Sequence, residues 1–76
     1  MKRPIEPVYR LIGARVEMLR TTLGMTQLDL AKRLGYTRPS IANIEAGNQR
    51  ILLHDVTRFA QAFGITEKNL MKGIWL

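Results

Sequence analysis

The chain has 76 residues, no cysteine, and a formal net charge of +6 from twelve Lys and Arg against six Asp and Glu. The lack of cysteine excludes disulfides and thiolate metal sites, and no apolar run reaches the roughly 20 residues of a membrane span. The basic excess favours a polyanionic partner, nucleic acid first and an anionic membrane second. No apolar signal-peptide core follows the charged start of the chain, so we expect a single cytoplasmic domain.

The first seven residues contain two prolines in four positions, which resist regular structure. We therefore expect residues 1–7 to form a flexible arm and residues 8–76 to form the domain. Apolar residues recur at helical spacing over residues 8–23, which predicts a first helix. Its apolar stripe consists of Tyr9, Ile12, Val16, Leu19 and Leu23.

Two shorter helices are expected next, over residues 27–34 and 38–46. Thr26 is a good N-cap for the first of them, and Asp29 three residues later completes the pattern of a capping box. Thr37 is the expected N-cap of the second, which has a proline in its first turn. The apolar residues expected to face inward are Leu30, Ala31, Leu34, Ile41 and Ile44.

The last two helices are predicted over residues 53–63 and 67–72, the second with Thr66 as its N-cap. Five of the six glycines fall where a helix should end. No segment alternates with a period of two residues, so the pattern predicts an all-α fold, a compact five-helix bundle without a sheet. The inward residues of the last two helices are predicted to be Leu53, Val56, Phe59, Ala60, Phe63, Leu70 and Met71.

Only Gly35, Tyr36 and Thr37 join the second and third predicted helices. A link this short, with glycine at its start, makes the two helices cross steeply, as in a helix-turn-helix unit, here residues 27–46. In such a unit the second helix lies in the major groove of DNA, and its first residues meet base edges. The groove requires a small, polar face. The outward positions of this helix are Arg38, Pro39, Ala42 and Asn43.

Three motifs of the chain resemble those of one family. Residues 25–35 are similar to TQ-x-x-LA-x-x-x-G, residues 40–47 to S-I-x-x-I/W-E-x-G, and residues 59–66 to A-x-A-L-G-V. Together they resemble the phage repressor and Cro type of DNA-binding domain, the Xre family, over about residues 12–70. The resemblance implies a lambda-repressor-like fold. Pro39 departs from the pattern, because many relatives have a polar, base-contacting residue there.

The resemblance implies a transcriptional regulator, expected to be a repressor, that binds double-stranded DNA as a homodimer on a pseudo-palindromic operator. It implies that Arg38 reads guanine, that Asn43 reads adenine, and that Pro39 and Ala42 touch a thymine methyl group. The residues implied to contact the DNA backbone are Gln27, Thr37, Ser40, Asn48, Gln49 and Arg50.

Some polar residues also have a structural interpretation. Ser40 either reaches the DNA or supports the cap of its own helix. Tyr36 either contacts a phosphate or covers the joint between helices, and the second interpretation is favoured. Glu45 is unexpected on a DNA-facing helix, and the resemblance implies that it forms a structural ion pair with Arg20, late in the first helix.

The end of the chain is apolar where a solvated terminus would be polar. We expect Ile74, Trp75 and Leu76 to contribute to a dimer contact; the alternatives are that they pack on the domain's own core or that a longer natural chain was cut here. His54 stands alone, so no metal site is expected. The sequence has no catalytic motif and no phosphate-binding loop, so we expect neither enzymatic activity nor a cofactor.

Three other functions stay open. The first is that of an antitoxin, which binds a toxin protein as well as DNA. The second is that of the controller of a restriction–modification system. The third is that of a protein-interaction module that does not bind DNA. The net charge and the polar residues Arg38, Asn43 and Gln27 argue against the last of these.

Overall fold

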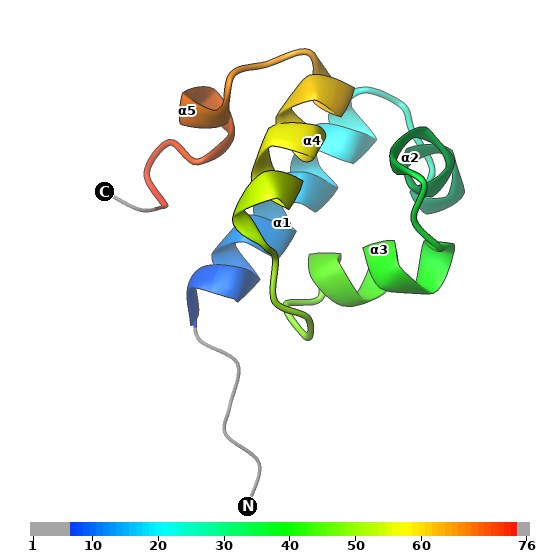
Figure 1. Ribbon diagram of the computed structural model, residues 1–76, viewed down its shortest axis with the longest axis horizontal. Coiled ribbons are helices and arrows are strands. Elements are labelled where there is room, and N and C mark those ends of the chain that lie inside the picture. Colours follow the sequence, from blue (N-terminus) through cyan, green and yellow to red (C-terminus); the bar gives the residue numbers. More distant parts are fainter. Residues whose placement is uncertain (1–6, 75–76) are drawn as a thin grey trace, which may run out of the picture.

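Five helices follow one another along residues 7–74, which is the part of the chain that this computed structural model describes. They are α1 (Pro7–Thr22), α2 (Gln27–Leu34), α3 (Arg38–Glu45), α4 (Leu53–Phe63) and α5 (Glu67–Leu70). α4 packs on α1, with α2 and α3 at one side of this pair and α5 at the other (Figure 1). The described residues form no strand, and none of these helices is long and apolar enough to cross a membrane. The predicted all-α, five-helix fold is confirmed.

The bounds of α2 and α4 are those predicted from the sequence. α1 begins at Pro7, which was expected to end the arm, and residues 1–6 of that arm lie outside the described residues. α3 ends one residue earlier than predicted, at Glu45, and α5 ends two residues earlier, at Leu70. At and just beyond the end of α5, the carbonyl groups of Asn69, Leu70 and Lys72 accept hydrogen bonds from Arg15 of α1, which ties the two helices together.

All five helices contribute apolar side chains to one core. The rings of Phe59 and Phe63 on α4 stack there, with their centroids 6.2 Å apart. Most residues predicted to face inward are buried, which confirms the helical periodicity read from the sequence. The largest fully buried side chains are Phe59, Leu30, Ile41, Ile44, Leu70, Met71 and Val16.

Two residues predicted to face inward are instead exposed: Leu23 at 51% of its surface and Leu53 at 74%. Leu23 follows Thr22, the last residue of α1, at the point where Gly24 turns the chain with φ 72°. Leu53 is the first residue of α4, and Ile51 in the preceding connection is buried in its place. Helical spacing predicts which way a side chain points inside a helix. At the ends of a helix the backbone leaves the helical geometry, so the spacing no longer predicts that direction.

Gly13 allows α1 to approach the C-terminal end of α3 closely. A Cβ atom at Gly13 would lie 2.2 Å from the carbonyl oxygen of Ile44 and 2.8 Å from that of Glu45. Both are main-chain atoms, which cannot swing aside as the tip of a side chain can. A glycine inside a helix lowers the stability of the helix by about 1 kcal/mol relative to alanine. At this position the close packing of α1 and α3 offsets that loss. The placement of α3 against α1 therefore depends on a missing side chain.

We expect Gly13→Ala to lower the free energy of unfolding by about 1–3 kcal/mol, because the added methyl group pushes α1 away from α3. Chemical denaturation monitored by circular dichroism measures this change. Helix propensity alone predicts the opposite sign, a gain of about 1 kcal/mol. A Gly13→Ala protein that is more stable than wild type would therefore contradict the close approach.

Candidate nucleic-acid interface

Residues 35–37 form the turn between α2 and α3. Gly35 has the left-handed conformation, with φ 74°, and its N–H bonds back to carbonyl groups in the last turn of α2. Thr37 then caps α3, because its hydroxyl accepts a hydrogen bond from the backbone N–H of Ser40 at 3.3 Å. The chain thus leaves one helix and enters the next within three residues, as the sequence predicted, and α3 packs across α2.

α3 has one face in the core and one face in solvent. Ile41 and Ile44 are buried on the inner face. The residues predicted to contact bases share the outer face and are Arg38, Pro39, Ala42 and Asn43. Ala42 is half-buried and the other three are exposed. The structure therefore brings the four predicted base-contacting residues together on one accessible surface.

The residues predicted to contact the DNA backbone flank this surface. Gln27 is half-buried at the start of α2, and residues 48–50 are exposed in the connection between α3 and α4. Gln49 lines a shallow hollow together with Thr37 and Ser40 at the start of α3. The connection and the N-terminal end of α3 therefore border the same depression.

The hydroxyl group of Ser40 takes part in the cap of its own helix. It accepts a hydrogen bond from the hydroxyl of Thr37 at 3.0 Å, while Thr37 accepts from the Ser40 backbone. The cap-supporting interpretation of Ser40 is thus realised in the structure. Ser40 is only half-buried, so its hydroxyl remains accessible beside the hollow.

Arg20 and Glu45 form a buried ion pair that connects α1 to α3. Arg20 Nε donates to Oε2 of Glu45 at 2.6 Å and Nη2 donates to Oε1 at 3.0 Å. Nη1 of Arg20 donates to the carbonyl of Met25, just before α2, at 2.7 Å. The hydrogen bond to Glu45 raises the pKa of Arg20. Glu45 is thus turned into the domain, and the acidic residue on α3 is part of its support rather than of its outer face.

Tyr36 covers the joint between the α2–α3 turn and α4. Its hydroxyl donates to Asp55, and its ring meets the ring of Phe59 edge-on at 6.2 Å. The guanidinium of Arg58 lies 5.1 Å from the Tyr36 ring centroid. Burial, and then the hydrogen bond to Asp55, raises the pKa of Tyr36. Tyr36 thus has the covering role that was favoured for it from the sequence.

Asp55 is one of the polar residues whose role was not predicted from the sequence. Besides accepting from Tyr36, it accepts a hydrogen bond from the backbone N–H of Leu52 at 3.0 Å, which satisfies a donor at the start of α4. The available signal was its place as an acidic residue in the first turn of a predicted helix. Nothing in the sequence pairs it with Tyr36, because that contact is tertiary.

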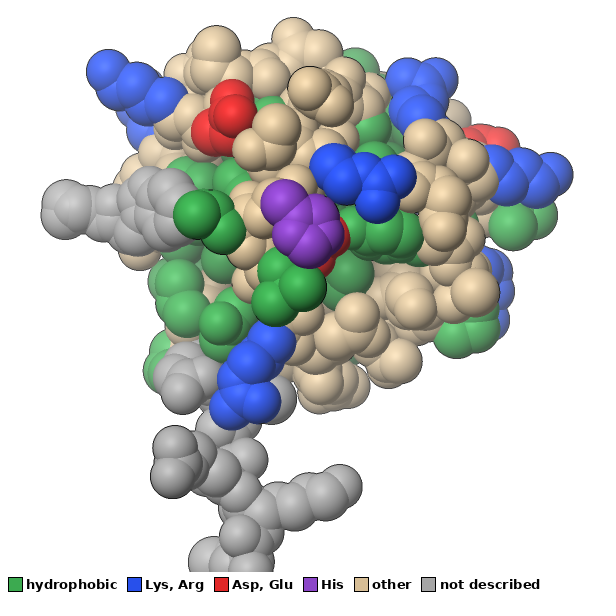
Figure 2. Space-filling model, viewed as in Figure 1, with side chains coloured by type: hydrophobic (Ala, Val, Ile, Leu, Met, Phe, Trp, Pro, Cys, Tyr) green, Lys and Arg blue, Asp and Glu red, His purple; other side chains and the backbone are tan. Residues whose placement is uncertain are grey.

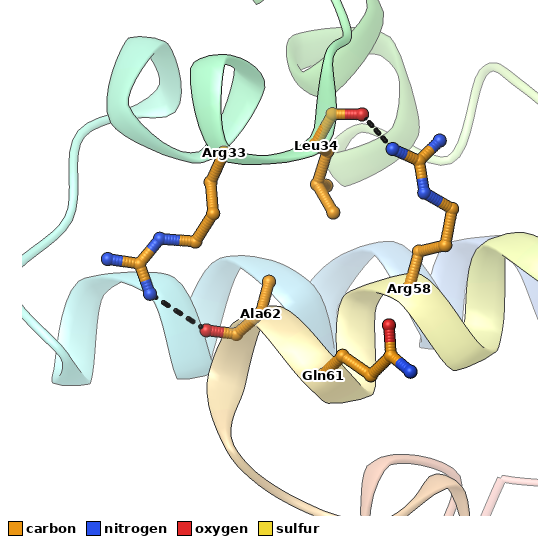
Figure 3. Close-up of a pocket in the computed structure, with 5 residues that line it drawn as sticks. All are labelled: Arg33, Leu34, Arg58, Gln61 and Ala62. Atoms are coloured by element: carbon orange, nitrogen blue, oxygen red, sulfur yellow. Dashed lines mark hydrogen bonds between the residues drawn. The ribbon is translucent and has the colours of Figure 1, made fainter.

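Two arginines, Arg33 and Arg58, line a hollow between α2 and α4 (Figure 3). Arg33 on α2 donates to the carbonyl of Ala62 on α4 at 3.2 Å, and Arg58 on α4 donates to the carbonyl of Leu34, the last residue of α2. Each helix thus places a positive charge at the negative C-terminal end of the other. This reciprocal capping fastens the α2–α3 unit to α4.

The lone histidine and the apolar end of the chain, both considered from the sequence, are the remaining positions. His54 is exposed, with Nε2 3.5 Å from Oδ1 of Asp55. Residues 7–74 contain no group of three His, Cys, Asp or Glu side chains that could hold a metal ion. Ile74 is partly buried and packs against the core, whereas Trp75 and Leu76 lie outside the described residues. Part of the surface of Ile74 is therefore already buried against the core of its own domain.

We expect Glu45→Ala to lower the free energy of unfolding by about 3–5 kcal/mol, because Arg20 would keep a buried charge without its partner. The double variant Arg20→Met, Glu45→Leu removes both charges and is expected to recover most of that loss. Denaturant titrations of the three proteins measure the effect. An exposed ion pair contributes only ~0–1 kcal/mol. If Glu45→Ala lowers the free energy of unfolding by no more than that, the structural role of the buried pair is refuted.

Several solved structures share this fold. The restriction-modification controller protein C.AhdI from Aeromonas hydrophila is 29% identical, with a TM-score of 0.77, over 82% of this chain and 94% of that chain. The clp gene regulator ClgR from Corynebacterium glutamicum is 18% identical, with a TM-score of 0.82, over 90% and 72%. The controller protein C.Esp1396I, solved as a tetramer with its natural 35 base-pair operator, is 17% identical, with a TM-score of 0.80, over 91% of each chain. No curated protein sequence is detectably similar.

The family described as helix-turn-helix domain matches residues 11–70. The match includes the whole of α2, the turn and α3, and extends from α1 to the end of α5. It confirms the resemblance carried by the sequence motifs. The chain belongs to the family of helix-turn-helix domains.

Proposed function

We propose that the protein binds specific sequences of double-stranded DNA as a homodimer and represses transcription by occupying a promoter. The observation that carries this proposal is the outer face of α3, where exposed Arg38 and Asn43 accompany the small side chains of Pro39 and Ala42. An α-helix fits the major groove, and sequence is read there by side chains that reach base edges. The family of the chain and its net charge of +6 support the same function.

The outer face of α3 offers different chemistry to different bases. Arg38 presents paired N–H donors that match O6 and N7 of guanine, and the Asn43 amide matches N6 and N7 of adenine. Pro39 and Ala42 offer apolar surface for a thymine methyl group and allow the helix backbone to come close. We assign sequence recognition to these four residues.

The surrounding residues position the protein on the duplex. The start of α2 carries Gln27 at the positive end of the helix dipole, which favours a phosphate. Gln49 lines one hollow with Thr37 and Ser40, and we assign these three residues, together with the exposed Asn48 and Arg50, to further contacts with DNA phosphates. Contacts of this kind set the register and most of the affinity, while base contacts set the sequence.

A second copy of the chain is proposed to cover the exposed leucines at the start of α4. Leu52 and Leu53 expose 60% and 74% of their surface, more than the other exposed large hydrophobic side chains of residues 7–74. In Figure 2, hydrophobic side chains lie next to the histidine, which is drawn in purple and follows this pair in the chain. A twofold dimer presents two copies of α3 to half-sites about 34 Å apart. Ile74, Trp75 and Leu76 remain proposed contributors to this contact.

One relative favours a more specific role. C.AhdI, a restriction-modification controller protein, is 29% identical and matches this chain over 94% of its own length. We therefore place the role of controller in a restriction–modification system ahead of that of an antitoxin. Genes for a DNA methyltransferase and an endonuclease beside the gene for this chain would support the assignment. Either role is regulatory rather than enzymatic and is carried out in the cytoplasm, where the DNA is.

The first test is selection of bound sequences from a random duplex pool by wild type and by Arg38→Ala. We expect wild type to enrich an inverted repeat and Arg38→Ala to lose preference at one symmetric position, with a cost of about 1–3 kcal/mol per contact. Lys68→Ala, which removes an exposed positive charge from α5, is the matched control and should lose preference at no position. Sequencing of the enriched pools measures each preference.

Enrichment of no sequence by wild type would refute sequence-specific binding. Retention of every preference by Arg38→Ala would refute the role of α3 but leave DNA binding standing. The affinity for the selected site should also fall steeply with salt, since each neutralised phosphate releases counterions. An affinity that does not change with salt would contradict the proposed backbone contacts.

We expect Leu53→Glu to weaken self-association at least about tenfold, because burial of a leucine contributes about 1.5–3 kcal/mol and a twofold contact buries it twice. Sedimentation equilibrium measures the association constant. Leu23→Glu, at a side chain exposed to 51% at the end of α1, is the matched control and should dimerise like wild type. Unchanged self-association of Leu53→Glu would mean that the interface lies elsewhere.

A further inference from the structure

A chain of hydrogen bonds runs from the core to the outer face of α3 through Gln27. At its inner end, Glu45 accepts hydrogen bonds from Arg20 at 2.6 and 3.0 Å. Nε2 of Gln27 donates to Oε1 of the same carboxylate at 3.1 Å. On its other side, Oε1 of Gln27 accepts from Nη1 of Arg38 at 3.1 Å. Four side chains from three helices thus form one network, and its outermost member is Arg38.

The two neighbours of Gln27 determine which way its amide faces. A carboxylate only accepts hydrogen bonds, and a guanidinium only donates them. The amide can satisfy both only with its nitrogen toward Glu45 and its oxygen toward Arg38. Glu45 is itself held in the core by Arg20 and is 8% exposed, so it is a fixed reference for the amide. The orientation is therefore set from inside the domain.

We propose that Glu45 and Gln27 are positioning residues for sequence recognition: Glu45 orients the amide of Gln27, and Gln27 holds Arg38 in the direction from which it reads its base pair. The inference rests on the proposed function and goes beyond it, because it gives a part in specificity to two residues that touch no base. A long side chain that is already held loses less rotamer entropy on binding. Gln27 thus acts on the sequence that is read, in addition to any phosphate contact.

Arg38 can keep the bond to Gln27 while it reads guanine. A guanidinium has five N–H donors, and Gln27 uses one of them. The paired contact to O6 and N7 of guanine needs two others. The amide of Gln27 likewise keeps its second N–H for a phosphate. The network therefore prepares Arg38 for the base pair and does not compete with the DNA for it.

The test is a double-mutant cycle of Gln27→Met and Arg38→Ala. Methionine is similar in length to glutamine and makes neither hydrogen bond, and the Arg20–Glu45 pair stays intact, so the variant is expected to fold. Dissociation constants are measured for the selected operator and for the same operator with the base pair read by Arg38 changed in both half-sites. The ratio of the two constants is the discrimination.

We expect Gln27→Met to lower the discrimination about three- to tenfold, the size of one hydrogen bond. In the Arg38→Ala background the same substitution should leave the discrimination unchanged. Lys32→Met is the matched control, because Lys32 is exposed on the same helix, and it should leave the ratio at the wild-type value.

Three outcomes would overturn the inference. An equal loss of affinity for both operators in Gln27→Met would make Gln27 a phosphate contact only. A higher ratio in Gln27→Met would mean that its bond restrains Arg38 from the base. Wild-type protein that discriminates between no sequences would refute the proposed function, and this inference with it, whereas the first two outcomes leave that function intact.

The part assigned to Glu45 is tested in the free protein by NMR of the Gln27 side-chain amide. The proton that faces Glu45 should lie downfield of its usual position, and it should stay there in Arg38→Ala. Amide shifts equal to those of a solvated glutamine would overturn the role of Glu45. This measurement needs no variant of the buried pair, so a loss of folding cannot be mistaken for a loss of positioning.

Discussion

The ion pair between Arg20 and Glu45 is the contact on which the α2–α3 unit depends. Arg20 on α1 bonds both to Glu45 on α3 and to the carbonyl of Met25 at the entry to α2, so one side chain constrains three helices. Both charged side chains are almost fully buried, where a partner is indispensable. Gly13 completes the arrangement by letting α1 lie close to the last carbonyls of α3. The outer face of α3 therefore has a fixed direction relative to the domain.

Several of the basic side chains have structural roles, so the net charge does not count residues that contact DNA. Arg15, Arg33 and Arg58 each donate to main-chain carbonyls near the C-terminal end of a helix, and Arg20 is in the core. In a domain this small, such bonds fasten helices that a limited core holds only in part. Net charge alone is thus a weak guide to the interface, and the exposed side chains of α3 are the better one.

Much of the fold was predictable because its signals are local. Thr26 and Asp29 form the predicted capping box of α2, and Thr37 caps α3 as expected. The five glycines expected at helix ends all have positive φ. The errors fall at helix ends: Leu23 and Leu53 fit the helical spacing but are exposed. A periodic pattern carries no information on whether a neighbouring element covers the last turn.

By itself, the sequence determined the five helices, the short turn between α2 and α3, and the four residues that share the outer face of α3, because caps, glycines and periodicity act within a few residues. Only the tertiary structure decided that Gln27 joins Glu45 to Arg38 and that Asp55 holds Tyr36. It also decided that arginines cap the ends of helices other than their own. These bonds join residues 11 to 55 positions apart, and a hydrogen bond over such a separation forms only after packing has brought its two groups together.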